Sequence, residues 1–100
     1  MFFGSAEIEN PVCLAPMEDI TDRPFRLLCK EMGADVLFTE FANCEAVIRN
    51  VSREVEKMMV TDLERPIGVQ VYGSNPAALE RAVAVAEDAG ADFVDMNAGC

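Results

Sequence analysis

One amide in an otherwise apolar stretch has the chemistry to bind a heterocycle. Gln70 interrupts the apolar run Ile67–Tyr72, where an unpaired buried amide would cost about 1–3 kcal/mol. Its carboxamide offers a donor and an acceptor, which suits the imide edge of a flavin or a pyrimidine. Hydrogen bonding to a neighbouring loop is the structural alternative for this side chain.

The last six residues, Asp95–Cys100, combine an aspartate within an apolar run, an asparagine at its end, and then glycine and cysteine. The Asn97 amide can hold a ring carbonyl and imide. Cys100 can donate a proton, because a free thiol with a pKa of about 8.5 is mostly protonated at neutral pH. A lone cysteine is more often a small buried hydrophobic residue, so the thiol alone does not establish catalysis.

The sequence contains no histidine, which excludes several catalytic mechanisms and one kind of metal site. Neither a Ser-His-Asp or Cys-His mechanism nor an ordinary His-bearing zinc site can be completed within these residues. We therefore expect proton chemistry from a carboxyl, thiol, phenol or lysine, and no metal site. Without an export signal or a Cys-x-x-Cys pair, the cysteines do not indicate a disulfide framework. We expect structural roles for Cys13, Cys29 and Cys44.

Composition indicates one ordinary globular domain at most. The chain has 100 residues, of which 51% are hydrophobic and 26% charged. Its net charge of −10 argues against a nucleic-acid surface on this stretch alone, because phosphate recognition needs clustered Lys and Arg. No apolar run approaches the ~20 residues of a membrane span, and Met1–Gly4 lacks the features of a signal peptide. We expect a soluble, cytoplasmic chain.

Hydrophobic periodicity predicts alternating strands and helices. Four short apolar runs are predicted strands: residues 12–15, 36–39, 67–72 and 93–96. The first helix is expected to begin after Thr21 or Asp22 and to end at Gly33. Its predicted apolar stripe is Phe25, Leu28, Cys29 and Met32, with Arg26, Lys30 and Glu31 facing water. Residues 44–59 predict one broken helix or two short ones, and residues 76–89 predict another helix.

This α/β alternation predicts a parallel sheet, either doubly wound or half of an eight-stranded barrel. A repeated Gly-Ala-Asp junction at residues 33–35 and 90–92 supports a recurring unit. Polar residues collect where the predicted strands end, as on the rim of a barrel. A barrel takes about 250 residues, so we predict parallel β/α units forming the first half, about four strands, of a TIM (β/α)8 barrel.

Four motifs in register resemble those of the tRNA-dihydrouridine synthases. The matching segments, in the family's order and approximate spacing, are residues 15–26 (APMEDITDRPFR), 33–35 (GAD) with 39–40 (TE), 69–76 (VQVYGSNP) and 95–100 (DMNAGC). The resemblance covers about residues 10–100, and the last segment resembles the start of the family's signature.

The resemblance implies an FMN-containing barrel that reduces the 5,6 double bond of a uridine in tRNA, with NADPH as the reductant. By position, the backbone of Pro16, Met17 and Glu18 would contact the isoalloxazine, and Gln70 would hydrogen-bond its polar edge. Glu18 lies where many relatives have a small residue, so its side chain is given no role.

The resemblance also implies roles for the end of the chain. Asn97 would position the target base, and Cys100 would protonate C5 while hydride from the flavin goes to C6. Because the flavin supplies the hydride, the protein contributes a positioned acid and orienting amides.

By the same comparison, residues 1–100 are expected to be the truncated amino-terminal half of an FMN-binding TIM-barrel domain. The second half-barrel and a helical carboxyl-terminal domain would be absent, together with the basic surface that binds tRNA. We expect this piece alone to be inactive as a synthase and to have weak or no FMN affinity.

Two other readings stay open. One is another FMN barrel that acts on a free pyrimidine, such as a dihydroorotate or dihydropyrimidine dehydrogenase. The other is a non-catalytic half-barrel that self-associates, because open sheet edges invite pairing.

Overall fold

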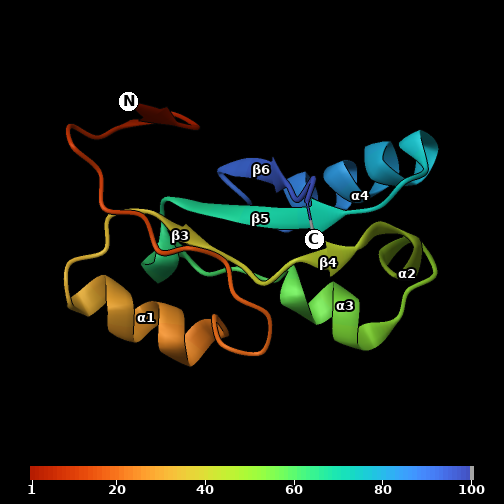
Figure 1. The fold of residues 1–100 in the computed structure, drawn as a ribbon, viewed down its shortest axis with the longest axis horizontal. Helices are drawn as coiled ribbons and strands as arrows, with labels where there is room; N and C mark the ends of the chain where they lie inside the picture. Colours follow the sequence, from red (N-terminus) through yellow and green to blue (C-terminus); the bar gives the residue numbers. More distant parts are fainter. Residues whose placement is uncertain (100) are drawn as a thin grey trace.

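A parallel sheet lies at the centre of the computed structural model, which describes residues 1–99 (Figure 1). Its strands are β3 (Leu37–Phe38), β4 (Ala42–Asn43), β5 (Ile67–Tyr72) and β6 (Phe93–Met96). β6 pairs with β5 over Gly68–Val71, so β3 and β4 must both lie along the other edge of β5. They are two halves of one interrupted strand. The prediction of a mixed α/β fold with a parallel sheet is confirmed.

The interruption between β3 and β4 is bridged by a side chain. The backbone N–H of Gln70 donates to the hydroxyl oxygen of Thr39 over 3.1 Å, and that hydroxyl donates to the Glu40 carbonyl over 2.9 Å. Thr39 is fully buried, so its hydroxyl satisfies backbone groups that the broken ladder would leave unpaired.

The strand predicted over residues 12–15 is reduced to one parallel bridge between Cys13 and Val36. The Leu14 N–H donates to the Val36 carbonyl over 2.9 Å, which places this segment beside β3. The segments therefore follow one another across the sheet in chain order, from residues 12–14 to β6.

Helices connect the strands: α1 (Arg23–Glu31), α2 (Cys44–Ile48), α3 (Ser52–Lys57), the 3-10 turn η1 (Asp62–Glu64) and α4 (Pro76–Asp88). Asp22 caps α1, accepting from the Phe25 N–H over 3.1 Å, and Gly33 follows the helix with a φ of +111°. The expected break in the third connection is confirmed, because Asn50 takes a φ of +59° between α2 and α3. Within residues 1–99 none of the helices combines the length and apolar character that crossing a membrane requires.

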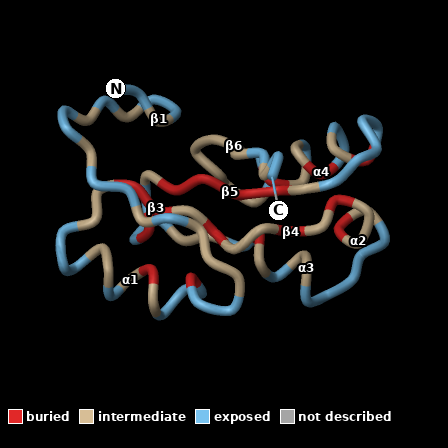
Figure 2. The backbone as a smooth tube through the Cα atoms, viewed as in Figure 1, coloured by how far each residue is buried: buried red, intermediate tan, exposed pale blue. Residues whose placement is uncertain are grey.

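One face of β5 packs into the hydrophobic core. Val69 and Val71 are fully buried, and they cluster with Val47 of α2, Met58 after α3 and the alanines on one side of α4. Figure 2 shows the buried backbone concentrated along β5 and the elements beside it. α1 lies on the same side as α3, because the Arg23 guanidinium donates to the Met59 carbonyl over 3.1 Å.

On the opposite face of the sheet, an aromatic cluster lies at the amino ends of the strands. Phe93 packs edge-on against Phe38, with ring centroids 5.4 Å apart, and in a tilted arrangement against Phe3, with centroids 5.7 Å apart. Phe3 belongs to a hairpin of β1 (Phe2–Phe3) and β2 (Ala6–Glu7), which the sequence patterns did not predict. The hairpin covers the end of the sheet opposite to the carboxyl ends of the strands.

The predicted orientation of α1 is wrong. Arg26, expected to face water, is only 3% exposed, whereas Leu28 and Met32 of the expected core stripe are 55% and 82% exposed. Arg26 is buried because it forms an ion pair with the buried carboxylate of Glu64, 38 residues further along the chain.

Gly68 provides a test of this packing. A Cβ at this position would overlap the ring of Phe93, whereas a Cβ at Gly99 would meet no atom within 4 Å. Gly68→Ala should therefore lower the free energy of unfolding by about 1–3 kcal/mol through overpacking, measured by chemical denaturation. Gly99→Ala is the matched control and should change it little. Equal stability of the Gly68→Ala variant and the wild type would contradict the packing described.

Candidate active site

The face of the sheet that bears the aromatic cluster becomes polar toward the carboxyl ends of the strands. Side chains alternate along β5, so Gln70 and Tyr72 point away from the core that holds Val69 and Val71. Gln70 pairs with Asp95 of β6, and its Nε2 donates to Asp95 Oδ2 over 2.6 Å. The partner of this amide is thus a neighbouring strand rather than a loop.

Gln70 keeps capacity for a ligand. Its side-chain amide has two N–H donors and a carbonyl acceptor, and the structure gives it no other side-chain hydrogen bond within residues 1–99. The residue is 7% exposed, so Asp95 holds the amide in one orientation at the boundary of the polar face. Asp95 stood out in the sequence, but the patterns did not predict that it positions Gln70.

A hollow of about 460 Å³ lies where β4, β5 and β6 end. It is lined by Asn43, Glu45, Tyr72, Gly73, Ser74, Asn97, Ala98 and Gly99. The Asn97 N–H extends the sheet ladder by donating to the Val71 carbonyl over 2.9 Å, and its Oδ1 accepts from the Gly99 N–H over 3.1 Å. The Asn97 side-chain NH₂ is therefore the group that can meet a ligand in this hollow.

The loop after residues 12–14 carries the predicted residues Pro16, Met17 and Glu18. The buried hydroxyl of Thr21 fixes this loop, since it accepts from the Met17 N–H over 3.1 Å and lies 3.2 Å from the Met17 carbonyl. The Arg26 guanidinium in turn donates to the Thr21 carbonyl over 2.7 Å. The backbone of the loop is thus attached to α1 through Thr21 and Arg26.

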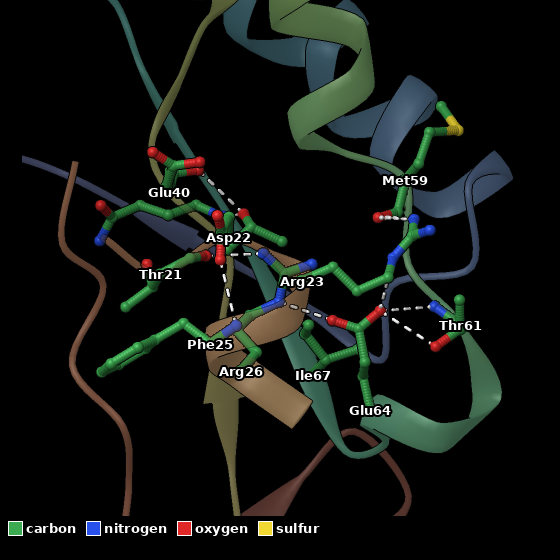
Figure 3. Close-up of polar contacts among 12 residues, drawn as sticks. Thr21, Asp22, Arg23, Phe25, Arg26, Glu40, Met59, Thr61, Glu64 and Ile67 are labelled. Carbon is green, nitrogen blue, oxygen red and sulfur yellow. Dashed lines mark hydrogen bonds and ion pairs between the residues drawn. The ribbon is translucent and has the colours of Figure 1, made fainter. Parts of the chain in front are cut away.

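A buried ion pair anchors this arrangement (Figure 3). Arg26 Nε lies 2.6 Å from Glu64 Oε2, and both side chains are at most 4% exposed. The other Glu64 oxygen accepts from the N–H and hydroxyl of Thr61, over 2.9 and 3.1 Å. Each partner is therefore paired and hydrogen-bonded, as burial of a charge requires.

The Glu18 side chain is engaged by a lysine. Lys57 Nζ lies 3.1 Å from Glu18 and 3.1 Å from Glu54, and its side chain is 11% exposed. Burial disfavours the ammonium, but the hydrogen bonds and charges of these two carboxylates outweigh it and raise the pKa of Lys57. Glu18 therefore acts in holding α3 against the loop.

Three carboxylates, of Glu18, Asp19 and Glu40, have oxygens within 4.8 Å of one another. Lys57 and Arg53 offset part of this charge through ion pairs with Glu18 and Asp19, and the Asp19 N–H donates to Glu40. We assign no metal to this group.

The internal cysteines do not form a second reactive site within the described residues. Cys44 is fully buried, and this burial raises the pKa of its thiol, which agrees with the expected structural role. Cys29 is half-buried on α1. Cys13 is exposed at the edge of the sheet, so the expectation of a buried structural role is wrong for this residue. Cys100 lies outside the described residues.

The structure brings Gln70 and Asn97 to one face of the sheet, and it places the Pro16–Glu18 loop at the carboxyl end of the segment furthest from β6. The roles given to these residues stay predictions. The sequence patterns missed Asn43 and Tyr72, although Tyr72 follows Gln70 by two positions and alternation could have placed both on one face.

Comparison with known proteins gives one consistent family. The protein-family model described as dihydrouridine synthase matches residues 13–100. The chain is 42% identical over 93 residues to a probable tRNA-dihydrouridine synthase of Aquifex aeolicus, covering 92% of this chain and 29% of that protein. It is 36% identical over 100 residues to tRNA-dihydrouridine synthase B of Xanthomonas axonopodis, covering 100% of this chain and 30% of that protein. The chain thus spans less than a third of the length of these curated relatives.

The buried ion pair gives a stability prediction. Arg26→Met leaves the Glu64 carboxylate buried without its main partner, so we expect the free energy of unfolding to fall by about 3–5 kcal/mol. Arg49→Met is the matched control, because Arg49 is 74% exposed and 4.0 Å from Glu45, and it should cost less than about 1 kcal/mol. If chemical denaturation gave the same loss of unfolding free energy for both variants, the buried pair would contribute no more to stability than the exposed one.

Lys57 gives a prediction for alkaline pH. Lys57→Met should cost about 1–3 kcal/mol at pH 7, because charged hydrogen bonds are lost. A raised folded-state pKa means that this stabilisation is complete below the unfolded pKa of about 10.4 and disappears as the pH rises through the folded value.

The difference in unfolding free energy between wild type and Lys57→Met should therefore be constant from about pH 7 to 9 and shrink above about pH 10.4. Arg53→Met, at a pair with Asp19 whose side chains are 74% and 77% exposed, should show a small difference throughout. A Lys57→Met difference that grows with alkaline pH would contradict the assignment.

Proposed function

Because the chain belongs to the dihydrouridine synthase family, we propose that the protein containing it reduces the 5,6 double bond of a uridine in tRNA. The observation that carries this proposal is the family match over residues 13–100. The placement of Gln70 and Asn97 on one polar face agrees with it, because one heterocycle could then meet both amides. As a tRNA-modifying enzyme, the protein would be an oxidoreductase that works in the cytoplasm.

The fold supports the amino-terminal half of a TIM barrel. Its parallel segments follow chain order across the sheet, as in a barrel, whereas a doubly wound sheet reverses its order. The helices lie on one side of it, and the other side carries side chains that would face a barrel interior. In this proposal residues 1–100 supply half of the FMN-binding domain, and the rest of the protein closes the barrel and carries the basic surface for tRNA.

The residues present fit FMN. Gln70 keeps a donor and an acceptor on the polar face, which matches the alternating donors and acceptors of a flavin imide edge. The backbone of Pro16, Met17 and Glu18 is fixed through Thr21, so it can contact the ring without first becoming ordered. FMN, once reduced by NADPH, would supply hydride to C6 of the uracil ring.

The remaining chemistry belongs to the chain's own side chains. Asn97 would orient the base, because its Oδ1 accepts from the Gly99 N–H and its NH₂, which makes no hydrogen bond within residues 1–99, would donate to a ring carbonyl. The Cys100 thiol would deliver a proton to C5, acting as a general acid at neutral pH.

The proposal is tested with the complete protein, FMN, NADPH and an unmodified tRNA transcript. Nucleoside mass spectrometry should detect dihydrouridine, and Cys100→Ala should lower its rate of formation by about 10²-fold or more. The reduction of the flavin by NADPH, followed by its absorbance, should stay unchanged in that variant.

Cys29→Ala, at a half-buried thiol of α1, is the matched control and should keep the rate of dihydrouridine formation. Turnover of free uracil or dihydroorotate in place of tRNA would contradict the proposal and favour a free-pyrimidine enzyme. An undiminished rate in Cys100→Ala would remove the acid role from this thiol.

A further inference from the structure

We propose that the Tyr72 hydroxyl donates a hydrogen bond to an oxygen of the uridine nucleoside bound in the hollow at the strand ends. This inference rests on the function proposed above and assigns it a further substrate-binding residue. The hollow of about 460 Å³ is bordered by Tyr72 and Asn97, and its size lies within the range of small-ligand sites.

The amide of Asn43 has only one chemically sensible orientation. Its side-chain oxygen lies 2.9 Å from the Glu45 N–H and 3.3 Å from the Ala46 N–H, where it caps α2. Backbone N–H groups can only donate, so the oxygen must face the helix. The NH₂ group therefore points the other way, toward the Tyr72 hydroxyl oxygen at 3.1 Å.

This orientation fixes the polarity of Tyr72. Asn43 Nδ2 has no lone pair to offer, so the Tyr72 oxygen must accept in this hydrogen bond. The structure shows no other hydrogen bond to the phenol within residues 1–99. The hydroxyl hydrogen of Tyr72 is thus left to donate to a ligand.

The phenol ring is held in place by aromatic packing. Its centroid lies 4.6 Å from that of Phe41 at an interplanar angle of 52°, a favourable tilted arrangement. Lys57 Nζ lies 5.8 Å from the centroid of the Phe41 ring. The donor is therefore pre-positioned, which limits the conformational entropy lost when a ligand binds.

The charge and the hydrogen-bond donors of the hollow indicate which kind of ligand it can bind. Among residues 1–99, the polar groups that line it are neutral apart from Glu45, and that carboxylate disfavours a phosphate. Tyr72 and Asn97 each present a donor, so the site suits a neutral group rich in acceptor oxygens. The ring carbonyls and ribose oxygens of uridine meet this requirement.

Two variants of the complete FMN-loaded protein test the donor. Tyr72→Phe removes the hydroxyl and keeps the ring, so we expect the KM for tRNA to rise about 3–10-fold, the equivalent of one hydrogen bond. Asn43→Asp keeps a good helix cap but offers a carboxylate that accepts the Tyr72 hydrogen. It should raise KM by a similar factor, although the tyrosine is intact.

The double variant should be no worse than the poorer single variant, because both changes remove the same hydrogen bond. Flavin reduction by NADPH should be unaffected in all three. Asn75→Asp is the matched control, since Asn75 caps α4 through the Ala77 N–H and does not line the hollow, and it should leave KM unchanged.

Binding of uridine alone, followed by NMR chemical shifts, separates this inference from the proposed function. If tRNA is not reduced but Tyr72→Phe still weakens uridine binding 3–10-fold, the reaction is wrong and the site stands. The inference is overturned if the wild type does not bind uridine, if Tyr72→Phe binds it as tightly as wild type, or if the two substitutions are additive.

Discussion

The two faces of the central strand β5 lie in different environments, one in the apolar core and one on the polar side of the sheet. The rest of the structure depends on this strand. Val69 and Val71 enter the core under α4, while the alternate residues Gln70 and Tyr72 face the polar side. Because side chains alternate with a period of two, a slip of one residue in its pairing would exchange these sets. Core packing therefore fixes the register that also aligns Gln70 with Asp95. Stability and the candidate site are set by the same pairing.

The two ends of the sheet are held by different kinds of contact. At the amino ends, the hairpin and the ring of Phe93 close the polar face with apolar contacts. At the carboxyl ends, polar contacts hold the backbone of the Pro16–Glu18 loop: Thr21 bonds to Met17, and Arg26, paired with Glu64, donates to the Thr21 carbonyl. This division matches barrels, in which the carboxyl face carries function and the amino face carries stability.

The sequence predicted what local patterns determine. The strands β5 and β6 have their expected bounds because each is a compact apolar run that pairs over most of its length. The strand expected over residues 12–15 is reduced to one bridge, because within residues 1–99 it pairs along a single edge, with Val36. The burial of Arg26 was missed because its partner, Glu64, is distant in sequence and helical periodicity assigns charged residues to the surface. Likewise, the donor role of Tyr72 follows from the orientation of Asn43, which spacing does not reveal.

The central claim is that the polar face of β5 receives the flavin and its substrate. The most direct measurement is a crystal structure of the complete protein with FMN bound. We predict that the polar edge of the isoalloxazine lies within hydrogen-bond distance, about 3 Å, of the Gln70 amide, with the ring beside the backbone of Pro16–Glu18. A flavin bound on the helix-covered side of the sheet, or one that leaves Gln70 bonded to Asp95 alone, would contradict it.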